Sequence, residues 1–298
     1  MSGRRVRRWA ITYAEPPLVL RGNLAPVPDT GTGERDQAEA APASAWAPVH
    51  RVSFVLPAFN EEANITRAID TTVAAAMRYC SVYEVLVVDD GSSDATAQLV
   101  ERALRDNSAV RLLRHGTNRG YGEALRTGFE HAALDFVFFT DADNQFDMDE
   151  LPLLLAWADD ADCVAGYRKQ RHDPLVRRLN AWAWNRLVRV LFCVPVRDVD
   201  CAFKLFRRDA LAAITIESGG AMINTEIMVK LSRAGRNTVE VGVSHRPRVA
   251  GAAHGANLQV ILRAFREVTH MYPQLADLGP TTSPTRAMPS VPEAASGA

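Results

Sequence analysis

The chain has 298 residues, of which 47% are hydrophobic and 23% are charged. Its 34 Lys and Arg residues nearly balance its 35 Asp and Glu residues, so the formal net charge is −1. This composition is that of an ordinary globular protein. It excludes a wholly disordered chain, and it provides no basic excess that would indicate a nucleic-acid partner.

The hydrophobic residues and the cysteines indicate whether the chain spans a membrane, forms disulfides or binds zinc. No stretch of about 18 uncharged apolar residues occurs, so we expect no membrane span. The four cysteines lie in apolar contexts without paired spacing, which predicts reduced thiols in a cytosolic protein and no zinc site; they are Cys80, Cys163, Cys193 and Cys201.

Both ends of the chain lack the patterns of folded elements. Residues 1–50 show no hydrophobic periodicity, and their basic start lacks the apolar region of a signal peptide. Residues 273–298 are dominated by Pro, Ser, Thr and Ala. We therefore predict a disordered N-terminal extension, a single domain over 51–272 and a disordered tail.

Between residues 51 and 168, short apolar runs alternate with segments of helical periodicity. The predicted strands cover 52–57, 85–90, 110–114, 136–141 and 163–167. The predicted helices cover 64–79, 94–105 (with Asp94 as N-cap), 121–133 and 148–158. This alternation predicts an α/β fold with a doubly wound, mostly parallel sheet and helices on both faces.

After residue 168 the pattern changes. We expect helices over 175–192, 223–233 and 258–271, with strands over 202–206 and 239–243. Charge changes as well, because residues 51–167 carry 20 acidic and 9 basic side chains, whereas residues 168–208 carry 3 acidic and 11 basic ones. An acidic half beside a basic segment suits a metal site next to a binder of anions, although solvated helix faces would explain part of it.

Acidic clusters end two of the predicted strands. Asp89 and Asp90 follow one apolar run, and Asp141 and Asp143 follow another. Ligands of open α/β sheets bind just outside the carboxyl ends of the strands. Carboxylates gathered there suit a hard divalent cation and the diphosphate that it carries, which indicates an enzyme acting on a nucleotide-linked substrate.

Several motifs occur in a fixed order along the chain. They are LPAFNEE (56–62), VVDDGS (87–92) and DAD (141–143), supported by NRGYGEALRTG (118–128), GYR (166–168), DVDCAFKL (198–205) and RVAG (248–251). Together they resemble the family 2 glycosyltransferases of GT-A fold, and within them the polyprenyl-phosphate sugar synthases of the dolichyl-phosphate mannose synthase type. The resemblance covers residues 52 to 266.

The resemblance implies a donor site at the strand ends. It assigns an Mg²⁺ or Mn²⁺ ion to Asp141, Asp143 and Gln145, with one carboxylate able to face the ribose. Further nucleotide-sugar contacts fall on Pro57, Phe59, Glu61, Val88, Asp90 and Ala142. The base, guanine or uracil, stays open. For Asp89 we favour a capping or core hydrogen-bonding role over ligand contact.

The resemblance also implies groups that bind phosphate. Arg168 and Arg248 match positions that grip phosphate, although surface solubility alone would also explain an arginine. His254 stands where the family commonly has lysine, which would make phosphate binding weaker and pH-dependent. Asp198 is the candidate for orienting the acceptor or for acting as the general base. We assign catalysis to Asp143, Asp198 and Arg168. Glu226 is a weaker candidate, equally well explained as a helix first-turn carboxylate.

These assignments predict a metal-dependent, inverting hexosyltransferase. It would move a hexose from a nucleoside diphosphate sugar (GDP-mannose or UDP-glucose type) to a polyprenyl phosphate at the cytoplasmic face of the membrane. The helix expected over 175–192 carries Trp182 and Trp184 among arginines, which suits either an anionic bilayer surface or ordinary amphipathic packing. The alternatives are a polysaccharide or soluble acceptor, a nucleotidyltransferase, and an inert nucleotide-sugar-binding scaffold.

Overall fold

The computed structural model describes residues 50–169, 186–187, 190–192, 194, 196–220, 222–248 and 269. The chain divides into two compact units, Met1–Ala43 and Ser44–Ala298, and every described residue belongs to the second. The predicted tail, the predicted N-terminal extension apart from His50, almost all of the helix over 258–271 and most of the helix over 175–192 lie outside the described residues.

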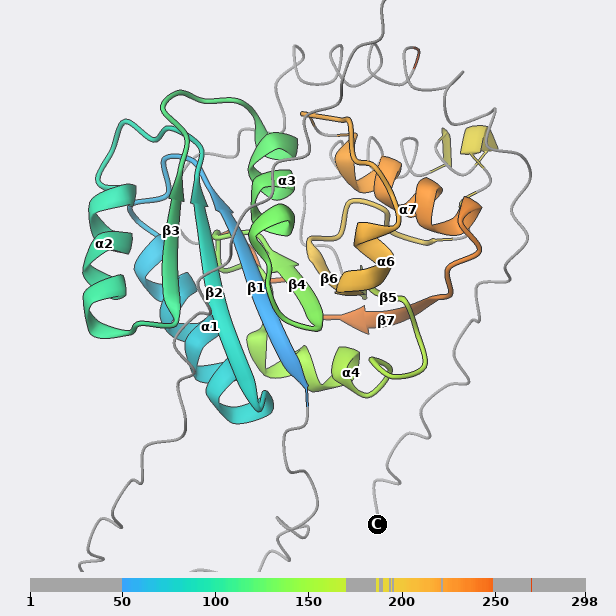
Figure 1. The fold of residues 1–298 in the computed structure, drawn as a ribbon, viewed down its shortest axis with the longest axis horizontal. Coiled ribbons are helices and arrows are strands. Elements are labelled where there is room, and N and C mark those ends of the chain that lie inside the picture. The colour runs from blue at the N-terminus through green and yellow to red at the C-terminus, as the bar shows by residue number, and fades with distance from the viewer. Residues whose placement is uncertain are drawn as a thin grey trace, which may run out of the picture. The chain divides into compact units, whose positions relative to one another are not determined.

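The described residues form one seven-stranded sheet with the order β3-β2-β1-β4-β6-β5-β7 (Figure 1). Its strands are β1 (Arg51–Ala58), β2 (Val82–Asp89), β3 (Val110–Arg114), β4 (Phe136–Thr140), β5 (Cys163–Arg168), β6 (Phe203–Arg207) and β7 (Thr238–Val243). β1 pairs in parallel with β2 and β4, and β5 pairs in parallel with β7. β6 is antiparallel to both of its neighbours, β4 and β5.

Helices cover both faces of this sheet. They are α1 (Ile65–Tyr79), α2 (Thr96–Asp106), α3 (Tyr121–His131), the 3-10 turn η1 (Met148–Glu150), α4 (Leu151–Leu155), α6 (Arg208–Ala212) and α7 (Ile223–Arg233). Successive side chains of a strand point to opposite faces, and those of β1 enter two separate apolar clusters. Phe54 and Leu56 pack with α1, α2 and α4, whereas Val55 packs with α3, α6 and α7.

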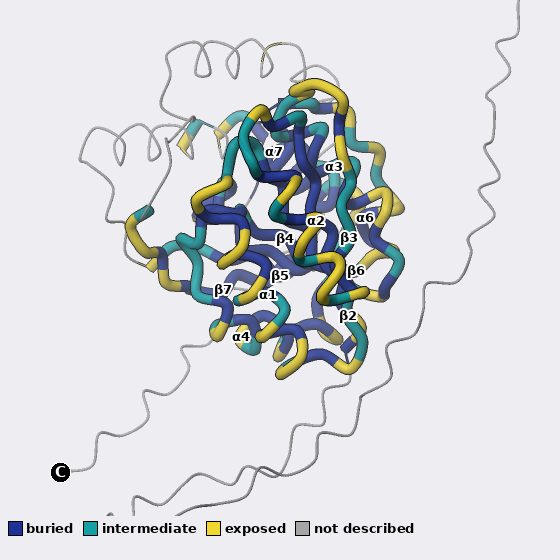
Figure 2. Tube along the Cα trace, turned by 90° about the vertical axis from the view of Figure 1, so that its left-hand side faces the viewer, coloured by how far each residue is buried: buried dark blue, intermediate teal, exposed yellow. Residues whose placement is uncertain are grey.

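Burial explains why the strands read as continuous apolar runs rather than as alternating ones. Seven of the eight residues of β1 are buried, as is all of β7, because helices close both faces of the sheet (Figure 2). The predicted doubly wound, mostly parallel α/β fold is therefore confirmed.

Two elements differ from the sequence-based expectation. The helix predicted over 148–158 is η1 followed by the short α4, and residues 156–160 are turns. The strand predicted over 202–206 forms as β6 inside the sheet, and it is followed directly by the unpredicted helix α6. Within the described residues, no helix has the length and apolar character needed to cross a membrane.

Candidate active site

The candidate site residues gather at one edge of the sheet. Because β6 is antiparallel to β4 and β5, the other six strands all run in the same direction and end at this edge. Each of five strands carries a candidate at or just beyond its carboxyl end: Glu61 after β1, Asp90 after β2, Asp141 and Asp143 after β4, Arg168 in β5, and Arg248 after β7.

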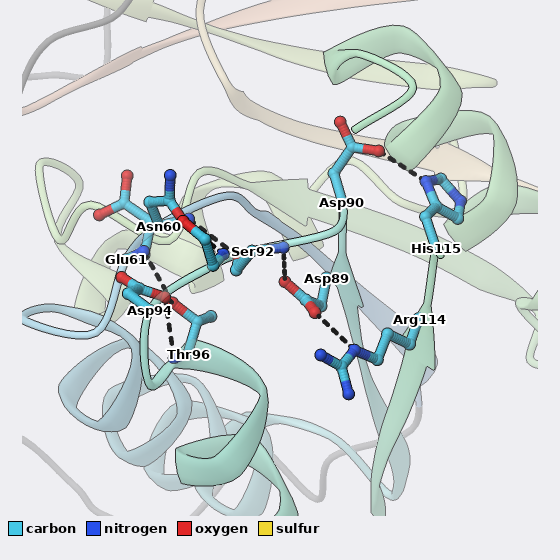
Figure 3. Close-up of polar contacts among 10 residues, drawn as sticks. Asn60, Glu61, Asp89, Asp90, Ser92, Asp94, Thr96, Arg114 and His115 are labelled. Atoms are coloured by element: carbon cyan, nitrogen blue, oxygen red, sulfur yellow. Dashed lines mark hydrogen bonds and ion pairs between the residues drawn. The ribbon is translucent and has the colours of Figure 1, made fainter. Parts of the chain in front are cut away.

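The loops after β1 and β2 hold each other through side-chain bonds (Figure 3). The amide of Asn60 donates to the hydroxyl of Ser92 over 2.9 Å, and the amide of Glu61 donates to the hydroxyl of Thr96 over 2.8 Å. Asp94 accepts from the amide of Thr96, the first residue of α2, over 3.0 Å, but the N-cap of α2 is Ala95 rather than the predicted Asp94. These hydrogen bonds hold the two loops together along one side of the site.

Asp89 and Asp90 are neighbours with different roles (Figure 3). Asp89 is fully buried, accepts from the amide of Ser92 over 3.1 Å and lies 3.3 Å from Nε of Arg114, which agrees with the structural role favoured from the sequence. Asp90 lies beside the β2 end and contacts Nδ1 of His115 over 2.6 Å. Its carboxylate therefore joins the loop after β2 to the end of β3.

Glycines allow tight approaches around this wall. Gly91 has a φ of +72°, and a Cβ there would lie 2.5 Å from the carbonyl carbon of Thr117. A Cβ on Gly122 would lie 2.5 Å from the carbonyl carbon of Gly219. The start of α3 thus packs directly on the backbone of the Gly219–Gly220 turn.

The two carboxylates after β4 have different surroundings. Asp141 accepts a 2.9 Å hydrogen bond from the hydroxyl of Tyr121, and Asp143 accepts from the amide of Gln145 over 3.1 Å. Asn144, which lies between Asp143 and Gln145 in the chain, has a φ of +59°, so the chain turns there. Burial, followed by the charge of Asp143, raises the pKa of Asp141 to about 7. Burial also raises the pKa of Asp143.

Arg248 connects the ends of three strands. Its guanidinium donates to Glu61 over 2.5 Å and lies 3.7 Å from the Asp143 carboxylate. The segment that carries it is tied to the segment after β4, because Gln145 donates through its side-chain amide to the carbonyl of Arg246 over 3.0 Å. One arginine thus partly balances two carboxylates in the site.

Arg168 and Asp198 form a two-point ion pair beside these carboxylates. Nε and a terminal nitrogen of Arg168 each donate to Asp198 over 2.6 Å, and the two side chains are 12% and 9% exposed. Both carboxylate oxygens of Asp198 are therefore engaged by Arg168. The buried Lys204 donates to the carbonyls of Val199 and Cys201 and so stabilises the turn that carries Asp198.

The remaining candidates are placed as follows. Pro57, Val88 and Ala142 are buried, and Phe59 is partly buried. Glu226 is fully buried and accepts from the amides of Glu217 and Ser218 and from Nζ of Lys230, so it stabilises the turn before α7. His254 lies outside the described residues.

Sequence reasoning missed three residues that shape the site: His115, Tyr121 and Lys204. Lys204 had a signal, because a lone lysine inside the apolar run Phe203–Arg207 is costly to bury unless it has partners. His115 and Tyr121 had no local signal, since their partners lie 25 and 20 residues away along the chain.

The residues after β4 fit a divalent cation. Two close carboxylates whose pKa values are both raised hold an excess of negative charge that a cation would relieve. Among the described residues, no three His, Cys, Asp or Glu side chains are grouped as a complete metal site. Mg²⁺ in nucleotide sites is commonly held by one or two carboxylates, with water and phosphate oxygens completing the shell.

Known proteins are similar to this chain in sequence and in fold. The undecaprenyl-phosphate 4-deoxy-4-formamido-L-arabinose transferase of Shewanella sediminis is 32% identical over 240 residues, which cover 79% of this chain and 68% of the relative. The protein of the same name from Pseudomonas fluorescens is 33% identical over 258 residues, covering 84% and 71%.

The fold is shared with glucosyl-3-phosphoglycerate synthase of Mycobacterium tuberculosis, solved with Mn²⁺, uridine diphosphate and glucosyl-3-phosphoglycerate. The TM-score is 0.57 at 21% identity, and the match covers 78% of this chain and 81% of that one. The model of the family "Glycosyl transferase family 2" matches residues 53–215, which is more than half of the chain. The chain is therefore a glycosyltransferase of GT-A fold and belongs to glycosyl transferase family 2.

Proposed function

We propose that this glycosyltransferase moves a hexose or a closely related sugar from a nucleoside diphosphate sugar to a polyprenyl phosphate, and that it needs Mg²⁺ or Mn²⁺. The observation that carries the proposal is the meeting of Asp141, Asp143, Glu61 and Arg248 at the carboxyl ends of three strands. The relatives named for transfer to undecaprenyl phosphate support a lipid phosphate as acceptor.

In this proposal the carboxylates bind the cation and the arginines bind phosphate. Asp141 and Asp143, with the side-chain oxygen of Gln145, would hold the cation, which neutralises charge on the departing diphosphate. Arg248 offers a guanidinium that can bind phosphate oxygens once it leaves Glu61. Pro57, Phe59, Glu61, Val88, Asp90 and Ala142 would bind the nucleoside, and His254 would add a pH-dependent phosphate contact.

Arg168 and Asp198 would serve the acceptor. Asp198 holds two nitrogens of the Arg168 guanidinium, so the remaining N–H groups of Arg168 have a fixed direction and can bind an acceptor phosphate. A phosphate monoester is largely ionised at neutral pH, so its oxygen can attack without a strong base. Positioning and charge stabilisation would then supply most of the rate, and direct attack on the anomeric carbon inverts it.

The test is transfer of label from radioactive nucleotide sugars to undecaprenyl phosphate in detergent, with Mn²⁺ or with chelator. We expect butanol-extractable label that depends on the metal and is lost in Asp143→Asn. Asp149→Asn is the matched control, because this carboxylate is 75% exposed and pairs only weakly with Arg78. Label in a water-soluble product alone would indicate a soluble acceptor, and binding without any transfer would indicate an inert scaffold.

We also propose that the protein works at the inner face of the membrane as a peripheral protein, since the proposed acceptor, a polyprenyl phosphate, is a membrane lipid. The basic and aromatic segment 175–192, most of which lies outside the described residues, is the candidate contact. Co-sedimentation with anionic vesicles at low salt, lost at high salt, is the expected result. Equal recovery with neutral vesicles or without vesicles would contradict it.

A further inference from the structure

We propose that Lys204 is a positioning residue for the acceptor phosphate: it fixes the turn that carries Asp198 and balances the negative charge of that turn. This inference rests on the proposed function, because it assumes that a phosphate monoester binds beside the pair of Arg168 and Asp198. It goes beyond that function by assigning a role to a buried lysine inside the sheet, which acts through other residues.

Lys204 lies within the sheet, among apolar side chains. It belongs to β6, is in register with Phe139 of β4 and with Ala165 of β5, and is 1% exposed. Its neighbours in the strand, Phe203 and Leu205, are buried as well. A charged group in such a place costs free energy, and a methionine of similar length would fill the space without that cost. Packing of the core therefore does not explain a lysine at this position.

The surroundings of Nζ fit a charged ammonium group. Such a group has three hydrogens to donate and no lone pair, whereas a neutral amine has a lone pair that needs a donor. Nζ donates to the carbonyl of Val199 over 2.9 Å and to the carbonyl of Cys201. It also lies 5.4 Å from the centre of the Phe139 ring, whose face attracts a cation. Two carbonyls and one ring face thus match the three hydrogens of an ammonium group.

The hydrogen bonds of Lys204 connect it to the guanidinium of Arg168. Both carbonyls that Lys204 binds belong to the turn that carries Asp198, and the amide of Cys201 closes this turn by donating to the carbonyl of Asp198 over 3.2 Å. The Asp198 carboxylate in turn holds two nitrogens of Arg168 over 2.6 Å each. The direction of the Arg168 guanidinium therefore depends on Lys204, through the turn and Asp198.

The charge of Lys204 also sets the balance beside the proposed acceptor site. Asp198 and Asp200 bring two negative charges to the turn, and Arg168 brings one positive charge. Without Lys204 the excess negative charge would repel a phosphate dianion, and with Lys204 the charges cancel. Burial lowers the pKa of Lys204, and the carboxylates of Asp198 and Asp200 oppose that fall. The lysine and the two carboxylates therefore favour each other's charged forms.

The test compares two soluble phosphates that differ in charge. Farnesyl phosphate is a monoester and is largely a dianion at neutral pH, whereas farnesyl methyl phosphate is a monoanion. Each is titrated calorimetrically into the full chain with Mn²⁺ and with UDP or GDP, whichever the wild type binds. We expect the wild type to bind the monoester about fivefold or more tightly than the methyl ester. Equal binding of the two by the wild type would overturn the inference.

Lys204→Met removes the ammonium group and keeps the length of the side chain. Its preference for the monoester should fall to about twofold or less, because the turn keeps its excess negative charge. The KM for undecaprenyl phosphate should rise, whereas the dissociation constant of the nucleoside diphosphate should stay close to that of wild type. An unchanged preference in the folded variant would overturn the role of Lys204. If this variant does not fold, Lys204→Gln, which keeps a donor and removes the charge, should give the same result.

Lys230→Met is the matched control, because it removes the same charge from another largely enclosed lysine that binds a carbonyl. Lys230 is 14% exposed and donates to the carbonyl of Thr215 and to the carboxylate of Glu226 over 2.6 Å each. The control should lose stability, since Glu226 stays buried without its cation, and should keep the wild-type preference for the monoester. An equal loss of preference in both variants would show a general effect of charge and would overturn the role of Lys204.

The outcomes separate this inference from the function beneath it. A protein that transfers sugar to undecaprenyl phosphate, and whose preference for the monoester is the same before and after Lys204→Met, contradicts the inference alone. A protein that binds neither farnesyl compound and transfers no sugar to the lipid contradicts both.

Discussion

Arg168 and Asp198 form an ion pair that is almost enclosed, with the two side chains 12% and 9% exposed. Enclosed pairs contribute little net stability as a pair, but removal of one partner leaves a buried charge without compensation. Asp198→Asn should therefore lower the free energy of unfolding by about 3 kcal/mol.

Urea denaturation measures this change. The matched control is Asp209→Asn, which breaks the pair of Asp209 with Arg207 on the surface, where the side chains are 59% and 43% exposed. Exposed pairs contribute about 0 to 1 kcal/mol, so the control should stay close to wild type. A loss of equal size in both variants would show that enclosure of the Arg168 pair has no energetic consequence.

The carboxylate of Asp141 makes stability depend on pH. Its pKa is raised from 3.8 to about 7, so the folded protein holds this proton more tightly than the unfolded chain does. Without metal, the free energy of unfolding should therefore fall as pH rises from about 4 to about 7 and level off above, by an amount on the order of 1 to 3 kcal/mol.

Asp141→Asn removes this titration, so its stability should change less between pH 5 and pH 8 than that of wild type. Urea denaturation in chelator at the two pH values measures the difference. Divalent cations should reduce the wild-type slope, because they compete with the proton for the same oxygens. Parallel pH profiles for variant and wild type would contradict the raised pKa.

At the scale of elements, the contact between α3 and the Gly219–Gly220 turn depends on the absence of a side chain at Gly122. A Cβ there would lie 2.5 Å from one backbone atom and 2.7 Å from the next, so either α3 or the turn must shift. Gly122→Ala should destabilise the protein by about 1 to 3 kcal/mol, even though alanine favours a helix by about 1 kcal/mol.

Gly116→Ala is the matched control, because a Cβ at Gly116 would have no atom within 4 Å. Its stability should stay within about 0.5 kcal/mol of wild type in the same thermal and urea measurements. A stabilised Gly122→Ala variant would show that helix propensity outweighs the close packing. Because α3 begins with Tyr121, the partner of Asp141, we also expect Gly122→Ala to weaken metal-dependent nucleotide binding.

At the scale of the whole molecule, β6 joins two groups of parallel strands. β3, β2, β1 and β4 lie on one side of it, and β5 and β7 on the other. Both apolar clusters extend across this junction: one includes Val52 of β1 and Val239 of β7, and the other includes Val55 of β1 and Ala165 of β5. The sheet therefore has no boundary at which one half could keep its core without the other.

We expect the described part of the chain to unfold as one cooperative unit. Far-UV and near-UV circular dichroism should give superimposable urea transitions, and the amides of β1, β4 and β6 should exchange hydrogen only through global unfolding. A first transition that releases β5 and β7 while β1 stays protected would contradict this expectation.

Local patterns in the sequence were enough to predict most elements and the chemistry at their ends. The apolar runs at 52–57 and 85–90 predicted β1 and β2 to within a few residues, because strands buried on both faces must be apolar throughout. The carboxylates after two such runs predicted an acidic edge, since parallel strands end together. These inferences succeed because each depends on neighbours in the chain.

Partners distant along the chain were decided by the tertiary structure. The run 202–206 is strand-like, but its antiparallel place between β4 and β5 depends on pairing with residues from about 40 to 70 positions earlier. The engagement of Asp198 by Arg168, of Asp141 by Tyr121 and of Asp90 by His115 likewise appears only in the folded chain. The sequence determined which groups meet at the sheet edge, because strand direction brings them there. The three-dimensional packing decided which of their lone pairs and charges stay available to a ligand, because hydrogen bonds are set by positions in space.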